Sequence, residues 1–104
     1  MPANPRLIFL SGSAAGLTPG ATFPLTAPET IFGRSETCEI PIDSPTVSRH
    51  HARITRQGDT YLLDDLGSTL GTFINGAAIG KNTHPLSPGD QIRLGRDTLF
   101  EFQI

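Results

Sequence analysis

The chain has 104 residues, 37% of them hydrophobic and 17% charged, with a formal net charge of −2. This length fits one domain, the acidic balance argues against a general nucleic-acid-binding protein, and the single cysteine, Cys38, excludes an intramolecular disulfide. Because the apolar run Leu7 to Leu10 is too short to cross a bilayer, we expect one soluble, cytoplasmic domain over residues 1–104 with no membrane partner, and leave open a larger parent protein.

Short alternating segments predict β-strands along the whole chain. The segment at 6–11 is apolar on both faces, whereas period-two alternation follows at 22–26, 51–55, 59–65, 90–95 and 98–104. In the last of these, Phe100, Phe102 and Ile104 are predicted to share one face. Turn signals such as "LTPG", "RQGD" and "SPGD" separate the segments. The pattern predicts an all-β sandwich or barrel with mostly antiparallel strands.

Three predicted loops carry the residues that could bind a ligand or take part in chemistry. They are "FGRSETCE" (32–39), "SPTVSRHH" (44–51) and "DLGSTLGTFING" (65–76), which ends in the hairpin signal Asn75-Gly76. Gly67 and Gly71 permit positive φ, and loops of this kind form concave nests of N–H donors that hold anions. Gathered at one end of a sandwich, these loops would form a small pocket for one phosphate.

A metal site, a catalytic triad and a nucleotide-binding loop all fit the sequence less well. His50 and His51 are neighbours, which point to opposite faces of a strand, so no metal or other cofactor is expected. A triad of Ser48, His51 and an aspartate lacks a strained nucleophile turn, and "GSTLGT" lacks the Lys-Ser/Thr ending of a nucleotide-binding loop. We therefore expect a protein that is not an enzyme.

Four motifs together resemble the fork-head-associated (FHA) domain. "FGRS", "SRHHARI", "GSTLGTFING" and "LSPGDQIRLG" follow in the family's order at about its spacings, from Ile31 to Gly95. The resemblance implies an eleven-stranded β-sandwich whose loops at one end bind phosphothreonine in a partner protein or peptide. It also implies a role in phosphorylation-dependent interactions of Ser/Thr kinase signalling.

The resemblance assigns roles to particular residues. Arg34 would pair with the phosphate, Ser48 would give it a hydroxyl hydrogen bond, Arg49 would add a contact, and Thr69 would line the phosphothreonine pocket. Other matched positions would hold the loops in shape: Gly33, His51, Ser68, Gly71, Asn75 and Gly76.

Leu70 also falls at a predicted phosphopeptide-binding position, but it departs from the family pattern. The family has Ser-x-Asn-Gly-Thr, and its Asn bonds to the backbone of the bound peptide, whereas this chain has Leu70 at that position. Loss of one neutral hydrogen bond costs about 0.5–1.5 kcal/mol, at most about tenfold in affinity. The phosphate-contacting residues remain, so binding is predicted to weaken or to change in selectivity. The alternative is a phosphate-independent adaptor or self-association module on the same fold, with Leu70 in an apolar contact.

Overall fold

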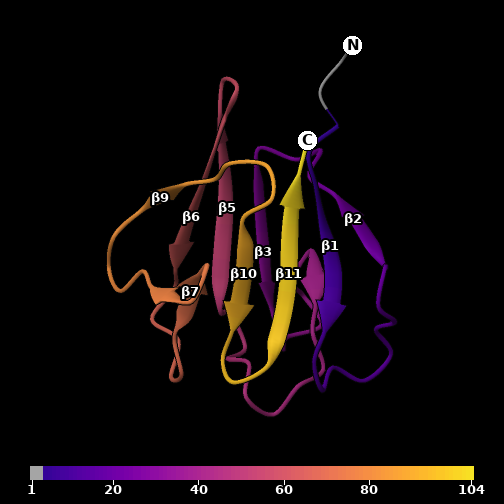
Figure 1. Cartoon of the computed structure of the whole chain (residues 1–104). Helices are drawn as coiled ribbons and strands as arrows, with labels where there is room; N and C mark the ends of the chain where they lie inside the picture. The colour runs from indigo at the N-terminus through magenta and orange to yellow at the C-terminus, as the bar shows by residue number, and fades with distance from the viewer. Residues whose placement is uncertain (1–3) are drawn as a thin grey trace.

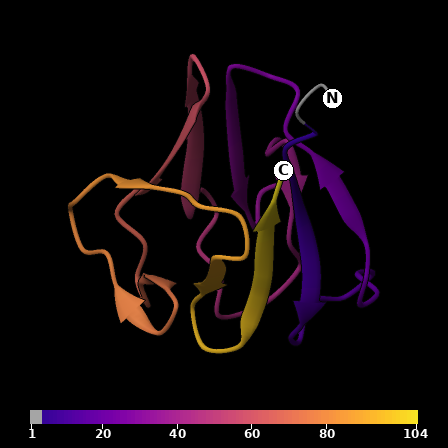
Figure 2. The ribbon, with the colours of Figure 1, turned by 45° about the horizontal axis from the view of Figure 1, so that its top comes forward.

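The computed structural model describes residues 4–104, so the first three residues of the predicted domain lie outside the described residues. These residues form eleven β-strands in two sheets that pack as the layers of a sandwich (Figures 1 and 2). The predicted all-β, eleven-stranded sandwich is confirmed. Residues 4–104 contain no helix long and apolar enough to cross a membrane.

One sheet has six strands and the other has five. The six-stranded sheet has the order β2 (Thr22–Pro24), β1 (Arg6–Ser11), β11 (Thr98–Gln103), β10 (Gln91–Leu94), β7 (Thr72–Ile74), β8 (Ala77–Ala78). The five-stranded sheet has the order β4 (Ile40–Pro41), β3 (Glu29–Gly33), β5 (Ala52–Gln57), β6 (Thr60–Asp65), β9 (His84–Pro85). The paired strands are antiparallel except β3 and β4, which run parallel.

The core fills the space between the sheets. Alternate side chains of each long strand are buried, as the period-two pattern predicts: Ala52 and Ile54 on β5, for example, and Ile92 and Leu94 on β10. The Phe100 ring meets rings from its own sheet and from the opposite one, with centroids 5.5 Å from Phe9 and 6.2 Å from Phe32. The prediction for Ile104 is wrong, because β11 ends at Gln103 and Ile104 is 44% exposed.

Four connecting segments meet at one end of the sandwich, the lower end in Figure 1, and we call this the loop end. It consists of residues 34–39 after β3, 42–51 before β5, 66–71 after β6, and the β10–β11 turn at 95–97. Backbone hydrogen bonds between these segments hold them together, and the C-terminus lies at the opposite end (Figure 1).

Candidate functional site

The first and second loops are joined through their backbones. The Arg34 N–H donates to the Ser48 carbonyl over 2.9 Å, and the Ser35 N–H donates to the Arg49 carbonyl over 3.0 Å. A Cβ atom on Gly33 would lie 2.3 Å from the Arg49 carbonyl oxygen. Glycine at position 33 therefore permits the close approach that sets Arg34 beside Ser48.

The Arg34 side chain is oriented by a backbone carbonyl. Its Nε donates to the Val47 carbonyl oxygen over 3.1 Å, while its two Nη groups take part in no hydrogen bond or ion pair within residues 4–104. The side chain is exposed. The terminal donors of the guanidinium are thus available to an anion, and one end of the group is already fixed.

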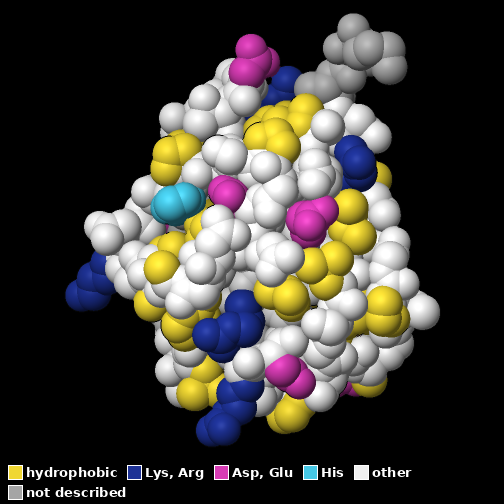
Figure 3. Space-filling model, in the orientation of Figure 1, with side chains coloured by type: hydrophobic (Ala, Val, Ile, Leu, Met, Phe, Trp, Pro, Cys, Tyr) yellow, Lys and Arg dark blue, Asp and Glu magenta, His cyan; other side chains and the backbone are white. Residues whose placement is uncertain are grey.

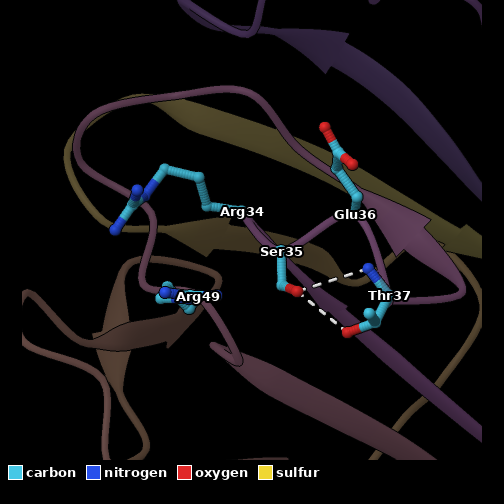
Figure 4. Close-up of a pocket in the computed structure, with 5 residues that line it drawn as sticks. All are labelled: Arg34, Ser35, Glu36, Thr37 and Arg49. Atoms are coloured by element: carbon cyan, nitrogen blue, oxygen red, sulfur yellow. Dashed lines mark hydrogen bonds between the residues drawn. The ribbon is translucent and has the colours of Figure 1, made fainter.

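Two hollows share Arg34. One, of about 210 Å³, is lined by Arg34, Pro45, Thr46, Val47, Ser48, Thr69 and Leu70. The other, of about 340 Å³, lies between Arg34, Ser35, Glu36, Thr37 and Arg49 (Figure 4). In Figure 4 the two arginine side chains stand on one side of this second hollow, and Glu36 stands on the other. We call the first hollow the central depression.

Ser48 links the second loop to the third. Its Oγ accepts a hydrogen bond from the Thr69 backbone N–H at 3.0 Å. Within residues 4–104 the Ser48 hydroxyl proton is not donated to any acceptor, so it can be given to a bound anion.

The third loop is organised by the carboxylate of Asp65. This carboxylate accepts hydrogen bonds from the backbone N–H groups of Gly67 and Ser68 and from the hydroxyls of Ser68 and Thr72. Burial by itself would raise the pKa of Asp65, but these hydrogen bonds outweigh it and hold the pKa below its ordinary value. The Ser68 hydroxyl in turn accepts from the Gly71 N–H over 3.0 Å. The loop is therefore ordered before any ligand arrives.

His51 is fully buried, and its ring joins the second loop to the third. Its Nδ1 accepts a hydrogen bond from the Ser48 N–H at 3.0 Å, and its Nε2 lies 2.7 Å from the Gly71 carbonyl oxygen. Only the neutral ring with the proton on Nε2 satisfies both contacts. Burial lowers the pKa of His51, against the opposing effects of the Gly71 carbonyl and the Asp65 charge. His50, by contrast, is exposed.

The Asn75-Gly76 pair forms the turn between β7 and β8, with φ of 50° and 88° respectively. The Asn75 side chain accepts from the Gln91 N–H over 2.9 Å and donates to Asp90 over 3.0 Å. The pair therefore ties the hairpin to β10, as a shape-holding residue would, and does not line the central depression.

Of the residues predicted to contact a ligand, Arg34, Ser48, Thr69 and Leu70 line the central depression, whereas Arg49 lines the neighbouring hollow. Leu70 is 39% exposed at the rim. Sequence reasoning missed the Val47 carbonyl, for which no residue-type signal exists. The contacts of Asp65 do carry a sequence signal, because the Asp65-x-x-Ser68 spacing is typical of side-chain-to-backbone hydrogen bonds.

The fold and the loop end define a class of protein: a β-sandwich recognition domain that carries its candidate binding residues on the loops of one end. Residues 30–95 match the family model of the FHA domain. The chain belongs to the FHA domain family.

Similar proteins extend this result. The chain is 41% identical over 81 residues to an oxoglutarate dehydrogenase inhibitor of Corynebacterium jeikeium; the match covers 78% of this chain and 55% of that protein, so the chain spans about half of its length. A structure of EmbR from Mycobacterium tuberculosis in complex with a low-affinity phosphopeptide is similar over 98% of this chain and 24% of that one, with 35% identity and a TM-score of 0.84. A structure from an analysis of phosphothreonine-dependent FHA domain interactions is also similar. The match covers 97% of this chain and 96% of that one, with 32% identity and a TM-score of 0.82.

Proposed function

We propose that this domain binds phosphothreonine in a partner protein or peptide and so mediates phosphorylation-dependent interactions in Ser/Thr kinase signalling, without enzymatic activity of its own. A cytoplasmic location is part of the same proposal. The observation that carries it is the central depression, where Arg34 and Ser48 present donors that the described residues leave unused. Two similarities support it: one to a structure from an analysis of phosphothreonine-dependent FHA domain interactions, and one to EmbR in complex with a low-affinity phosphopeptide.

The chemistry of the depression matches a phosphate monoester. Such a group brings about −1.5 to −2 charges and three acceptor oxygens. Arg34 supplies charged donors already oriented by Val47, and Ser48 supplies a hydroxyl already positioned by Thr69. Hydrogen bonds to charged groups contribute about 1.5–3 kcal/mol each. These two side chains together account for the predicted dependence on phosphate.

Leu70 limits how much the main chain of a bound peptide can contribute to the binding affinity. Its side chain stands at the rim of the central depression and offers no donor or acceptor. We propose that this domain has the family's phosphate contacts but one fewer bond to the peptide main chain. No observation on residues 4–104 favours the phosphate-independent alternative, so we do not propose it.

The test is binding to a degenerate phosphothreonine peptide library, with unphosphorylated and phosphoserine libraries alongside. We expect selective capture of phosphothreonine peptides. A buried methyl contributes about 0.8 kcal/mol, so phosphoserine peptides should bind roughly fourfold more weakly. A larger difference would require that the bound phosphothreonine side chain is also held in one conformation.

Arg34→Ala should abolish this capture, because loss of one or more charge-assisted bonds lowers affinity by at least about tenfold. Arg56→Ala is the matched control. Arg56 carries the same charge and is exposed near the end of β5 remote from the loop end, where its Nε donates to the Gly58 carbonyl. Equal affinity of the Arg34→Ala variant and the control would contradict the assignment of the pocket.

A further inference from the structure

The β10–β11 turn borders the central depression. The Gly95 N–H donates to the Gly71 carbonyl over 3.0 Å, which joins the turn to the third loop. On its other side the turn meets the second loop, because a Cβ atom on Gly95 would lie 2.2 Å from the Thr46 carbonyl oxygen. The Arg96 N–H also lies 3.4 Å from the Thr46 hydroxyl. Because Thr46 lines the central depression, Arg96 lies directly beside one of its lining residues.

Arg93 holds this turn in place. Its guanidinium carbon lies 3.9 Å from the centroid of the Phe73 ring, a distance typical of a cation–π contact. From there its Nη1 donates to the carbonyl oxygens of Gly95 and Arg96. The Phe73 ring itself lies against Gly71, with ring atoms 3.2 Å from the position of a Cβ there. The turn is therefore fixed to the same backbone segment that forms the third loop.

Arg96 is the basic side chain of this turn, and it has no ion-pair partner within residues 4–104. It is exposed, and the ion pairs within residues 4–104 are those of Arg53 with Asp64 and Glu29. Its neighbour Asp97 is engaged elsewhere, since its carboxylate accepts from the hydroxyl and the N–H of Ser13. In the face shown in Figure 3, basic side chains lie at the loop end with an acidic side chain beside them, and other basic side chains are spread over the rest of the face.

We propose that Arg96 is a specificity-determining residue: it binds an anionic side chain of the ligand, a carboxylate or a second phosphate, at a position flanking the phosphothreonine. This inference rests on the proposed function. A ligand that places its phosphate between Arg34 and Ser48 must continue across the rim of the depression, and Arg96 lies beside Thr46, one of the residues that line it. An exposed ion pair of this kind should tighten binding by about two- to fivefold, and the gain should decrease at high salt.

The experiment measures dissociation constants for phosphothreonine peptides with alanine flanks, into which a single glutamate is introduced at each flanking position in turn. We expect a two- to fivefold preference for glutamate at one or two positions, relative to the alanine-flanked peptide, and a ratio near one in Arg96→Gln. The control, Arg56→Gln, removes the same charge far from the loop end and should keep the wild-type ratio. A phosphoserine at the preferred position distinguishes a second phosphate from a carboxylate as the favoured anion.

Two results would overturn the inference. One is the absence of any glutamate preference in the wild-type domain; the other is a preference that Arg96→Gln leaves intact at every position. The alanine-flanked peptide tests the proposed function by itself, because its binding should depend on phosphate and on Arg34. If that peptide binds and the glutamate series is flat, the proposed function stands and the role of Arg96 is wrong. If that peptide shows no phosphate-dependent binding, both are wrong.

Discussion

Replacing His51 with alanine should destabilise the domain through the loops and not through the sheets. The ring is fully buried, and its removal leaves the Ser48 N–H without an acceptor. An unsatisfied buried donor costs about 1–3 kcal/mol. The Gly71 carbonyl keeps its bond from the Gly95 N–H, so the second lost contact costs less. A cavity adds roughly 24 cal/mol per Å³, and we expect a total of about 3 kcal/mol.

The assay is thermal and urea unfolding of His51→Ala beside His50→Ala. At about 4–8 °C per kcal/mol for a domain of this size, the melting temperature of His51→Ala should fall by about 12–24 °C. His50 is exposed, so its substitution should change stability by no more than about 0.5 kcal/mol. Two results would refute the reasoning: a His51→Ala variant as stable as the His50 control, or a fully stable His51→Ala variant that no longer binds phosphopeptide.

The remaining predictions concern pH, the rim and the loop junction. Burial lowers the pKa of His51 from 6.5, so the unfolded chain takes up a proton at a higher pH than the folded domain does. The contribution of neutral His51 to the free energy of unfolding is therefore complete above pH 6.5 and is lost as the pH falls through the folded-state pKa. Urea titrations between about pH 7 and pH 5 should show this loss, and His51→Gln should flatten it. Leu70→Asn should tighten binding of generic phosphothreonine peptides by up to about tenfold in a calorimetric titration, and an unchanged affinity would show that the lost Asn is unimportant here. Gly33→Ala should cost about 1–3 kcal/mol in urea unfolding and weaken phosphopeptide binding, because its Cβ would strike the Arg49 carbonyl; wild-type stability would contradict that contact.

The inward faces of the strands were predictable because side-chain direction alternates within a strand, whatever the strand pairs with. Ile92 and Leu94 on β10 illustrate this. Strand partners were less predictable. The parallel pairing of β3 with β4 sets Phe32 beside Ile40, and β4 is only two residues long. So short a strand has no alternation to read, and its pairing depends on contacts between distant parts of the chain.

In the candidate site, too, the local sequence predicted some features, and contacts made by the folded backbone decided the others. The types and spacing of Arg34 and Ser48 suggested an anion pocket, and the structure places both on one depression. The path of the backbone decides what spacing cannot: that Val47 offers its carbonyl to Arg34, and that Arg49 lines a different hollow. The contacts of the β10–β11 turn with Thr46 were also beyond prediction, since 50 residues separate the two partners in sequence.

One carbonyl group at the loop end accepts two donors from different parts of the chain. The Gly71 oxygen receives the Nε2–H of His51 and the N–H of Gly95, so both of its lone pairs are used. Opening either contact exposes the other to water, and the segments should therefore open together, as one cooperative unit of native-state hydrogen exchange. The amide protons of Ser48 and Gly95 would then exchange with a similar free energy of opening. A ligand held between these segments would meet loops whose conformational entropy was already lost during folding.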